Sequence, residues 1–300
     1  MSDEARVGGK PDMRFDTITF MSDYGYDDEF VGVCKSVIRS IAPEVAVIDL
    51  THGIRAHDVR AASLLLARSA QWLNPGVVLA VVDPGVGTRR RAIAVEVGGG
   101  TSVLVGPDNG LLAPAVQMVG GATKVVELVN ERYRLQRPGV TFDGRDVFAP
   151  AAAYICRGVP LEEFGPTVDP NSLTPALVPV ARDLPDGGRA CEVLWIDRFG
   201  NAQLNVAPED VADLGVPVRI EVGSEFSRSV RVVGAFDDLA DGEVGLVVDS
   251  YGLLAVALRR RSAAEEIGLR EGSEVVLRPI GVQTPVDVKI RTGDAEEGGR

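Results

Sequence analysis

The chain has 300 residues, of which 45% are hydrophobic and 25% charged, and its formal net charge at pH 7 is −12. This length exceeds what one hydrophobic core usually supports, so we expect two domains. The acidic balance argues against binding to nucleic acid, which relies on clustered Lys and Arg, whereas a cationic small molecule would be attracted. No apolar run approaches the ~20 residues needed to cross a bilayer, and we expect a cytoplasmic protein without a membrane partner.

Residues 16–165 alternate apolar runs with segments of helical periodicity. The apolar runs are dense enough for buried parallel strands, and they lie at 18–21, 45–50 and 77–82. Three helices are predicted: one from Phe30 that ends at Pro43, one after the N-cap candidate Asp58 that includes Trp72, and one from Asp146 to Ile155 with Pro150 near its first turn. This alternation predicts an N-terminal α/β domain with a central, mostly parallel sheet.

A proline-rich stretch at 166–189 loses this periodicity and predicts a domain linker. Over residues 190–283, short β-like runs separated by Gly, Asp and Pro predict a smaller C-terminal domain, an antiparallel β-barrel. The runs lie at 193–196, 218–222, 230–233, 243–248, 254–257 and 274–278. Residues 1–15 and 284–300 have the composition of tails without fixed structure.

Four loops rich in acidic residues and glycine lie where strands of the first domain are predicted to end, which is where ligands bind in open α/β sheets. In the loop 21–28, the carboxylate of Asp23 can accept hydrogen bonds from both hydroxyls of a ribose, although a plain turn and helix cap explains the residue types equally well. In the loop 82–90, Asp83 can pair with Arg90, which would keep the carboxylate ionised and able to orient a water molecule. The alternative for this loop is a solvated turn with surface arginines.

The other two of these loops, and two turn-like segments of the second domain, also contain side chains able to bind a ligand. They lie at 106–112, 141–150, 196–201 and 249–254. The first has the Asn-Gly pair of a tight turn. The second is a glycine loop that continues into a helix N-terminus, which can receive a carboxylate such as that of a methionine moiety. Taken singly, the last two are most simply hairpin turns.

In this order, the segments resemble the S-adenosylmethionine hydroxide adenosyltransferase family, the hydrolytic relatives of bacterial fluorinase and chlorinase. The resemblance extends from Ile18 to about Pro279, and its most specific parts are Asp-Pro-Gly-Val-Gly-Thr at 83–88, Gly-Pro-Asp-Asn-Gly-Leu-Leu at 106–112 and Phe-Gly-Asn at 199–201. It implies an S-adenosyl-L-methionine hydrolase, in which water or hydroxide attacks the ribose 5′ carbon to give adenosine and methionine. It also implies a homotrimer with sites at subunit interfaces, and neither a cofactor nor a metal.

The same resemblance implies roles for individual residues. Asp23 would hold the ribose hydroxyls, and Phe142 would line the ribose and the reacting carbon. The methionine end would contact Asp28, Asp197 and Ser250. The adenine would lie near Phe199 and Asn201, with backbone from the stretch Arg260 to Ala263. The residues proposed to activate water would be Asp83, Arg90 and Asp143.

One of these positions departs from the family pattern. Where the family typically has Thr-Phe-His-Gly-Arg-Asp, this chain has Asp143 in place of the histidine. Methionine leaves as a neutral thioether and needs no general acid, so positioning and desolvation can supply much of the acceleration. Asp143 can pair with Arg90 or share a proton with Asp83. We therefore expect an active but slower site.

Three other functions are consistent with parts of the sequence. A halogenase is disfavoured because the carboxylates of Asp83 and Asp143 would repel a halide. A non-catalytic protein that binds S-adenosylmethionine or adenosine is the main alternative. A metal-dependent phosphohydrolase would have to use His52, His57 and Asp58, whose spacing is not a convincing ligand set, and we expect both histidines at the surface.

Overall fold

A computed structural model describes residues 14–136 and 139–280. The predicted tail at 284–300, and all but the last two residues of the predicted tail at 1–15, lie outside these ranges. The chain divides into two compact units between Val178 and Pro179, and each is described by itself.

The first unit is built on a six-stranded sheet with the strand order β2-β1-β3-β5-β4-β6. The strands are β1 (Thr17–Ser22), β2 (Ala46–Thr51), β3 (Gly76–Val81), β4 (Ala92–Val97), β5 (Ser102–Pro107) and β6 (Ala122–Glu127). The neighbours from β2 to β5 run parallel, whereas β4 is antiparallel to both β5 and β6. The predicted α/β class with a mostly parallel sheet is confirmed. The carboxyl ends of β1, β2 and β3 therefore lie at one edge of the sheet.

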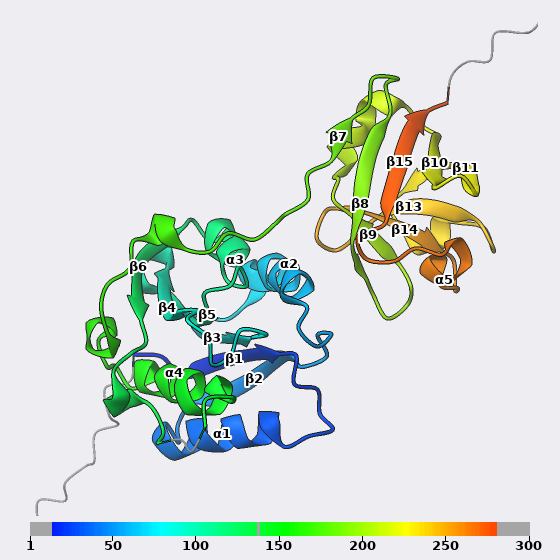
Figure 1. The fold of residues 1–300 in the computed structure, drawn as a ribbon. Helices are drawn as coiled ribbons and strands as arrows, with labels where there is room; N and C mark the ends of the chain where they lie inside the picture. The colour runs from blue at the N-terminus through cyan, green and yellow to red at the C-terminus, as the bar shows by residue number, and fades with distance from the viewer. Residues whose placement is uncertain (1–13, 137–138, 281–300) are drawn as a thin grey trace, which may run out of the picture. The chain divides into compact units, whose positions relative to one another are not determined.

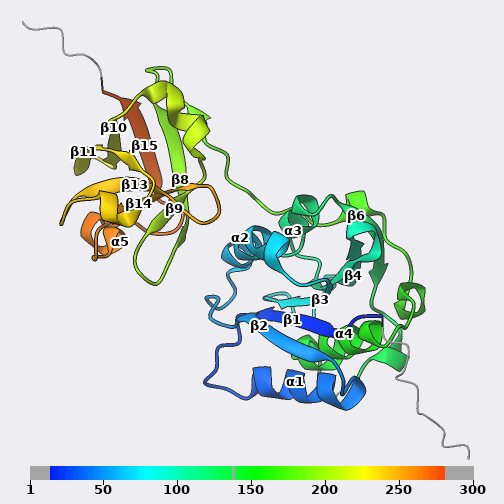
Figure 2. The same ribbon diagram turned by 180° about the vertical axis from the view of Figure 1, so that it is seen from behind.

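Helices cover both faces of this sheet, as Figures 1 and 2 show. The helices are α1 (Phe30–Ile41), α2 (Val59–Ser69), α3 (Ala113–Met118) and α4 (Ala149–Cys156). α1 packs beside α4, and α2 beside α3. The N-cap prediction is confirmed, because an Asp58 carboxylate oxygen accepts the backbone N–H of Ala61 at 2.9 Å. Pro150 lies in the first turn of α4, as expected, after a π-helical turn at Gly144–Phe148.

Two expectations about burial are wrong. Trp72 does not extend the apolar face of α2, because the helix ends at Ser69 and Trp72 follows in a 3-10 turn with 71% of its surface exposed. The run at 45–50 forms a strand that is not buried: β2 lies at the edge of the sheet, pairs only with β1, and exposes 43% of Ile48. An apolar run alone does not distinguish an edge strand from a central one.

The second unit contains a nine-stranded, barrel-like sheet. Its strands are β7 (Arg182–Asp183), β8 (Arg189–Ile196), β9 (Ala202–Leu204), β10 (Val218–Val222), β11 (Phe226–Val230), β12 (Val232–Val233), β13 (Val244–Val248), β14 (Leu254–Leu258) and β15 (Glu274–Pro279), and a short helix α5 (Ala263–Ile267) follows β14. All pairs are antiparallel except β12 with β13. The predicted antiparallel barrel is confirmed, although the run expected at 230–233 is divided between β11 and β12.

Candidate active site

A cleft of about 810 Å³ opens in the first unit, beside the loops that follow β1 and β3. This volume lies within the usual range for small-molecule sites, roughly 300–1,000 Å³. Five of the residues proposed from the sequence line it: Asp23, Asp28, Asp83, Phe142 and Asp143. The cleft therefore brings together all the candidate residues of the first unit except Arg90. Arg90 contacts two of these residues, Asp83 and Asp143.

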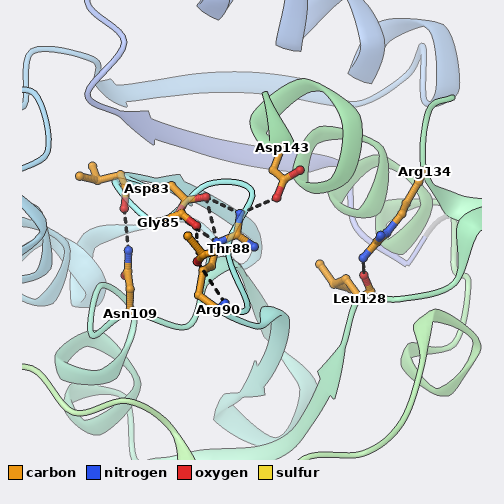
Figure 3. Close-up of polar contacts among 9 residues, drawn as sticks. Asp83, Gly85, Thr88, Arg90, Asn109, Leu128, Arg134 and Asp143 are labelled. Carbon is orange, nitrogen blue, oxygen red and sulfur yellow. Dashed lines mark hydrogen bonds and ion pairs between the residues drawn. The ribbon is translucent and has the colours of Figure 1, made fainter. Parts of the chain in front are cut away.

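Arg90 bridges two carboxylates (Figure 3). Its Nε donates to both carboxylate oxygens of Asp83, at 2.9 and 3.0 Å, and its Nη2 also contacts that carboxylate. The same Nη2 lies 2.5 Å from Oδ2 of Asp143. The side chains of Asp83, Arg90 and Asp143 are only 6%, 12% and 9% exposed. Both pairings foreseen for Arg90 are present, and the three residues form one buried ionic cluster.

The loop that carries Asp83 and Arg90 is held by contacts within the loop and by one from the loop after β5 (Figure 3). The Thr88 hydroxyl donates to the carbonyl oxygen of Gly85 at 2.6 Å. A Cβ on Gly85 would lie 3.3 Å from Cγ of Arg90, so a larger residue there would crowd the arginine. The Asn109 side chain, from the loop after β5, donates to the carbonyl oxygen of Val82 at 2.9 Å. These contacts fix the direction of Asp83, and the role of Asn109 was not foreseen.

The charge balance of the cluster suits a cationic ligand. Burial acts to lower the pKa of Arg90, but hydrogen bonds and charge from Asp83 and Asp143 outweigh it and raise the pKa above its usual value. One permanent positive charge thus faces two carboxylates, and Asp23 and Asp28 line the same cleft. Arg145 also lines the cleft, but the acidic side chains outnumber the basic ones, and this balance favours a cation over an anion.

An aromatic wall lies beside the acidic cluster. The Phe142 ring makes edge contacts with Tyr24, at 5.7 Å between ring centroids, and with Phe30, at 5.1 Å. Burial and the nearby Cys34, Asp23, Asp83 and Asp143 raise the pKa of Tyr24 well above its usual value, which keeps the phenol neutral. The Tyr24 hydroxyl fills the space beside Gly144, where a Cβ would lie 2.0 Å from its oxygen.

The second unit has a pocket of its own, of about 460 Å³. Phe199, Asn201 and Arg260 line it, and 72% of Phe199 is exposed, which leaves a ring available for stacking. The other three candidates of this unit are not among its lining residues. They are Asp197, Ser250 and Ala263.

Those three residues have other surroundings. The Asp197 carboxylate accepts the backbone N–H groups of Phe199 and Asn201 and the Asn201 side-chain amide, each at 2.9 Å. Ser250 is exposed in a turn, and Ala263 is fully buried at the start of α5. Asp197 thus organises the turn that presents Phe199 and Asn201.

The histidines do not form a metal site. Within the described ranges, no three His, Cys, Asp or Glu side chains are grouped so that they could hold a metal ion. The expectation that both histidines lie at the surface is wrong for His52, which is fully buried with its ring against Ser22. Across the same ranges, no helix is both long and apolar enough to span a membrane.

Each of the two units matches a domain of a known protein family. The sequence profile of the SAM hydroxide adenosyltransferase N-terminal domain matches residues 18–165, and that of the C-terminal domain matches residues 191–276. The chain belongs to the SAM hydroxide adenosyltransferase family. The buried ionic cluster of Asp83, Arg90 and Asp143 lies within the first matched region, and the residues of the Phe199 pocket lie within the second.

Several named relatives are similar to this chain over most of their length. The chain is 43% identical over 258 residues to the (R)-S-adenosyl-L-methionine hydrolase of Salinispora tropica, covering 86% of this chain and 96% of that protein. It is 41% identical over 268 residues to the enzyme of the same name from Thermus thermophilus, covering 87% and 98%. The fluorinase of Actinopolyspora mzabensis is more distant, at 28% over 288 residues, with 86% and 95% covered.

A solved structure agrees with the fold. A crystal structure of an uncharacterized conserved protein from Thermotoga maritima superposes with a TM-score of 0.80 at 33% identity, covering 87% of this chain and 99% of that one. The family resemblance inferred from the motifs is confirmed by the two matching domain models and by these relatives.

Proposed function

We propose that the protein is a cytoplasmic hydrolase that converts S-adenosyl-L-methionine and water into adenosine and L-methionine. The observation that carries this proposal is the buried Asp83, Arg90 and Asp143 cluster at the wall of a cleft of substrate size. Relatives at 41% and 43% identity are named as hydrolases of this sulfonium.

The reaction is a displacement at the ribose 5′ carbon. A bond forms between the water oxygen and this carbon, the carbon–sulfur bond breaks, and its electron pair leaves with the sulfur of methionine. Asp83 orients the water and accepts its proton directly or through solvent, while Arg90 holds the carboxylate in place. No group has to protonate the neutral thioether, and the proposal includes no metal and no cofactor.

Water is the expected nucleophile in place of a halide. Two carboxylates, from Asp83 and Asp143, share one guanidinium, so the cluster retains net negative charge. A halide beside it would be repelled, and the cost rises as the effective dielectric constant falls. The net negative charge of the cluster therefore argues for hydrolysis in this chain, although a fluorinase is among its relatives.

The remaining substrate contacts and the assembly are part of the same proposal. Asp23 and Asp28 bind the ribose and methionine ends, Phe142 lines the reacting carbon, and the Phe199 pocket receives the adenine. Asp197 and Ser250 contact the methionine end, and Ala263 contributes backbone near the adenine. We propose a homotrimer with sites at subunit interfaces, for which the exposed edge strand β2 offers a surface.

Product analysis with the separate sulfur epimers tests the proposed reaction. Because the relatives are named for the R epimer, we expect adenosine and methionine in equal amounts from (R)-S-adenosyl-L-methionine, and less turnover of the S epimer. High chloride and a chelator should leave the rate unchanged. A 5′-chlorinated nucleoside would establish a halogenase, and tight nucleoside binding without turnover would establish a binding protein. Chromatography with mass detection distinguishes these results.

Asp143→His tests the departure from the family pattern. In the parent, Asp143 adds a second carboxylate to Arg90. An imidazole there would relieve this crowding of negative charge and supply a second proton acceptor. Positioned acid–base groups contribute about 10²- to 10⁴-fold, and because Asp83 is already present we expect a smaller gain in kcat, about tenfold. Equal single-turnover rates would show that the departure has no kinetic consequence.

A further inference from the structure

His52 contacts the loop that carries Asp23 at two points, on either side of Asp23. The loop begins at Ser22, the last residue of β1, while His52 follows the parallel neighbour β2. Nδ1 of the His52 ring lies 2.7 Å from the Ser22 hydroxyl oxygen. The carbonyl oxygen of His52 accepts the backbone N–H of Gly25 at 2.8 Å. Asp23 and Tyr24 are therefore fixed between two contacts to one residue.

The hydrogen-bond network determines the tautomer of this histidine. The Ser22 oxygen accepts the backbone N–H of Tyr24 at 3.2 Å and can pair with Nδ1 of His52 in either direction, but the carboxylate of Asp49 beside Nε2 can only accept a proton. The proton of a neutral ring then belongs to Nε2, which faces Oδ1 of Asp49 at 3.2 Å. Lys35 in turn donates to Asp49 at 2.6 Å. Among the described residues, Nδ1 is therefore the ring nitrogen with a hydrogen bond, and Nε2 has only the nearby Asp49 carboxylate.

The surroundings keep this ring neutral and immobile. Burial lowers the pKa of His52, and the opposing effect of Asp49 does not outweigh it. The ring edge packs against Phe20, at 4.6 Å between centroids, and against Tyr26, at 5.3 Å. His52 is fully buried, and it is not among the residues that line the cleft. Any effect on a ligand must therefore act through the loop.

We propose that His52 and Ser22 are positioning residues for ribose recognition, because together they direct the Asp23 carboxylate toward the ribose hydroxyls. The inference rests on the proposed function, in which Asp23 binds the ribose. A second contact supports the direction: the backbone N–H of His57 donates to Oδ2 of Asp23 at 2.9 Å. Without the acceptor at His52, the Ser22 hydroxyl would lose its partner and the loop one of its two contacts.

The test compares variants that keep or remove the acceptor. In His52→Asn, the side-chain oxygen can take the place of Nδ1, whereas His52→Leu has similar bulk and no acceptor. Ser22→Ala removes only the hydroxyl and is the mildest change. Affinities for adenosine, 2′-deoxyadenosine and 3′-deoxyadenosine are measured by calorimetry, together with kcat and KM. Unfolding midpoints identify any variant that has lost its fold.

The parent should prefer adenosine by about ten- to a hundredfold, as expected when hydroxyls bind a carboxylate. His52→Leu and Ser22→Ala should reduce this preference to about threefold or less and raise KM more than they lower kcat, while His52→Asn should retain most of it. In an Asp23→Ala background, His52→Leu should have no further effect on the preference.

Two results would overturn the inference, and they differ in meaning. A full preference for adenosine in folded Ser22→Ala and His52→Leu would remove the positioning role alone. A parent that binds the three nucleosides equally would remove the assignment of Asp23 to the ribose as well. Equal binding of the three nucleosides would count against the proposed function, and it can be measured on the parent protein without any variant.

Discussion

Asp83→Asn is expected to lower kcat by about 10²- to 10⁴-fold, the range for loss of a positioned acid–base group, with little change in adenosine affinity. Asparagine keeps the shape of the side chain, but it has no negative charge and cannot accept the water proton at neutral pH. Arg90 would still be paired with Asp143, so the loop should keep its fold. Single-turnover release of adenosine measures the chemical step apart from product release.

The loop after β5 offers a matched control. Asp108 also pairs with an arginine after β3, with Arg91 Nε donating to it at 2.8 Å, but it does not line the cleft. Asp108→Asn should therefore leave kcat within about threefold of the parent, because surface or structural pairs act on stability more than on chemistry. If Asp83→Asn retained the parental kcat, the carboxylate would have no part in the reaction, and positioning of the sulfonium alone would account for turnover.

Parts of the site were predictable because they are local. Asp83 and Arg90 are seven residues apart on one loop after an apolar strand, so their pairing followed from spacing and charge. The contact from Asp143 to Arg90 spans 53 residues, and from the sequence it was one of two alternatives. Asp197 was expected at the ligand, and its use in organising a turn depends on backbone N–H directions that residue types do not reveal.

Long-range partners explain what was missed. His52 has the polar neighbours of a surface residue, and its burial depends on Ser22, which is 30 residues away on the adjacent strand. The edge position of β2 likewise depends on strand order, which periodicity does not contain. The alternation of elements did predict the α/β class and the barrel, because hydrophobic period and turn residues are properties of the sequence itself.

Arg90→Met is expected to be the most destabilising of the substitutions considered, by about 3–5 kcal/mol. The methionine keeps most of the side-chain volume but loses the contact on Phe148, whose ring centroid lies 5.2 Å from the guanidinium carbon. Two carboxylates, from Asp83 and Asp143, would then remain almost fully buried without their shared cation. Desolvation of an uncompensated charge is the dominant cost in such a change. Urea unfolding at neutral pH measures the loss.

Arg91→Met is the matched control for Arg90→Met. Arg91 pairs with one buried carboxylate, Asp108, and its own side chain is 29% exposed, so Arg91→Met should cost distinctly less. Adding Asp83→Asn and Asp143→Asn to Arg90→Met removes the unpaired charges and should recover most of the lost stability. Equal losses for Arg90→Met and Arg91→Met, or no recovery in the triple variant, would mean that the cluster contributes packing alone. Recovery of stability without recovery of turnover would show that the two carboxylates are retained at Arg90 for the reaction, at a cost to the fold.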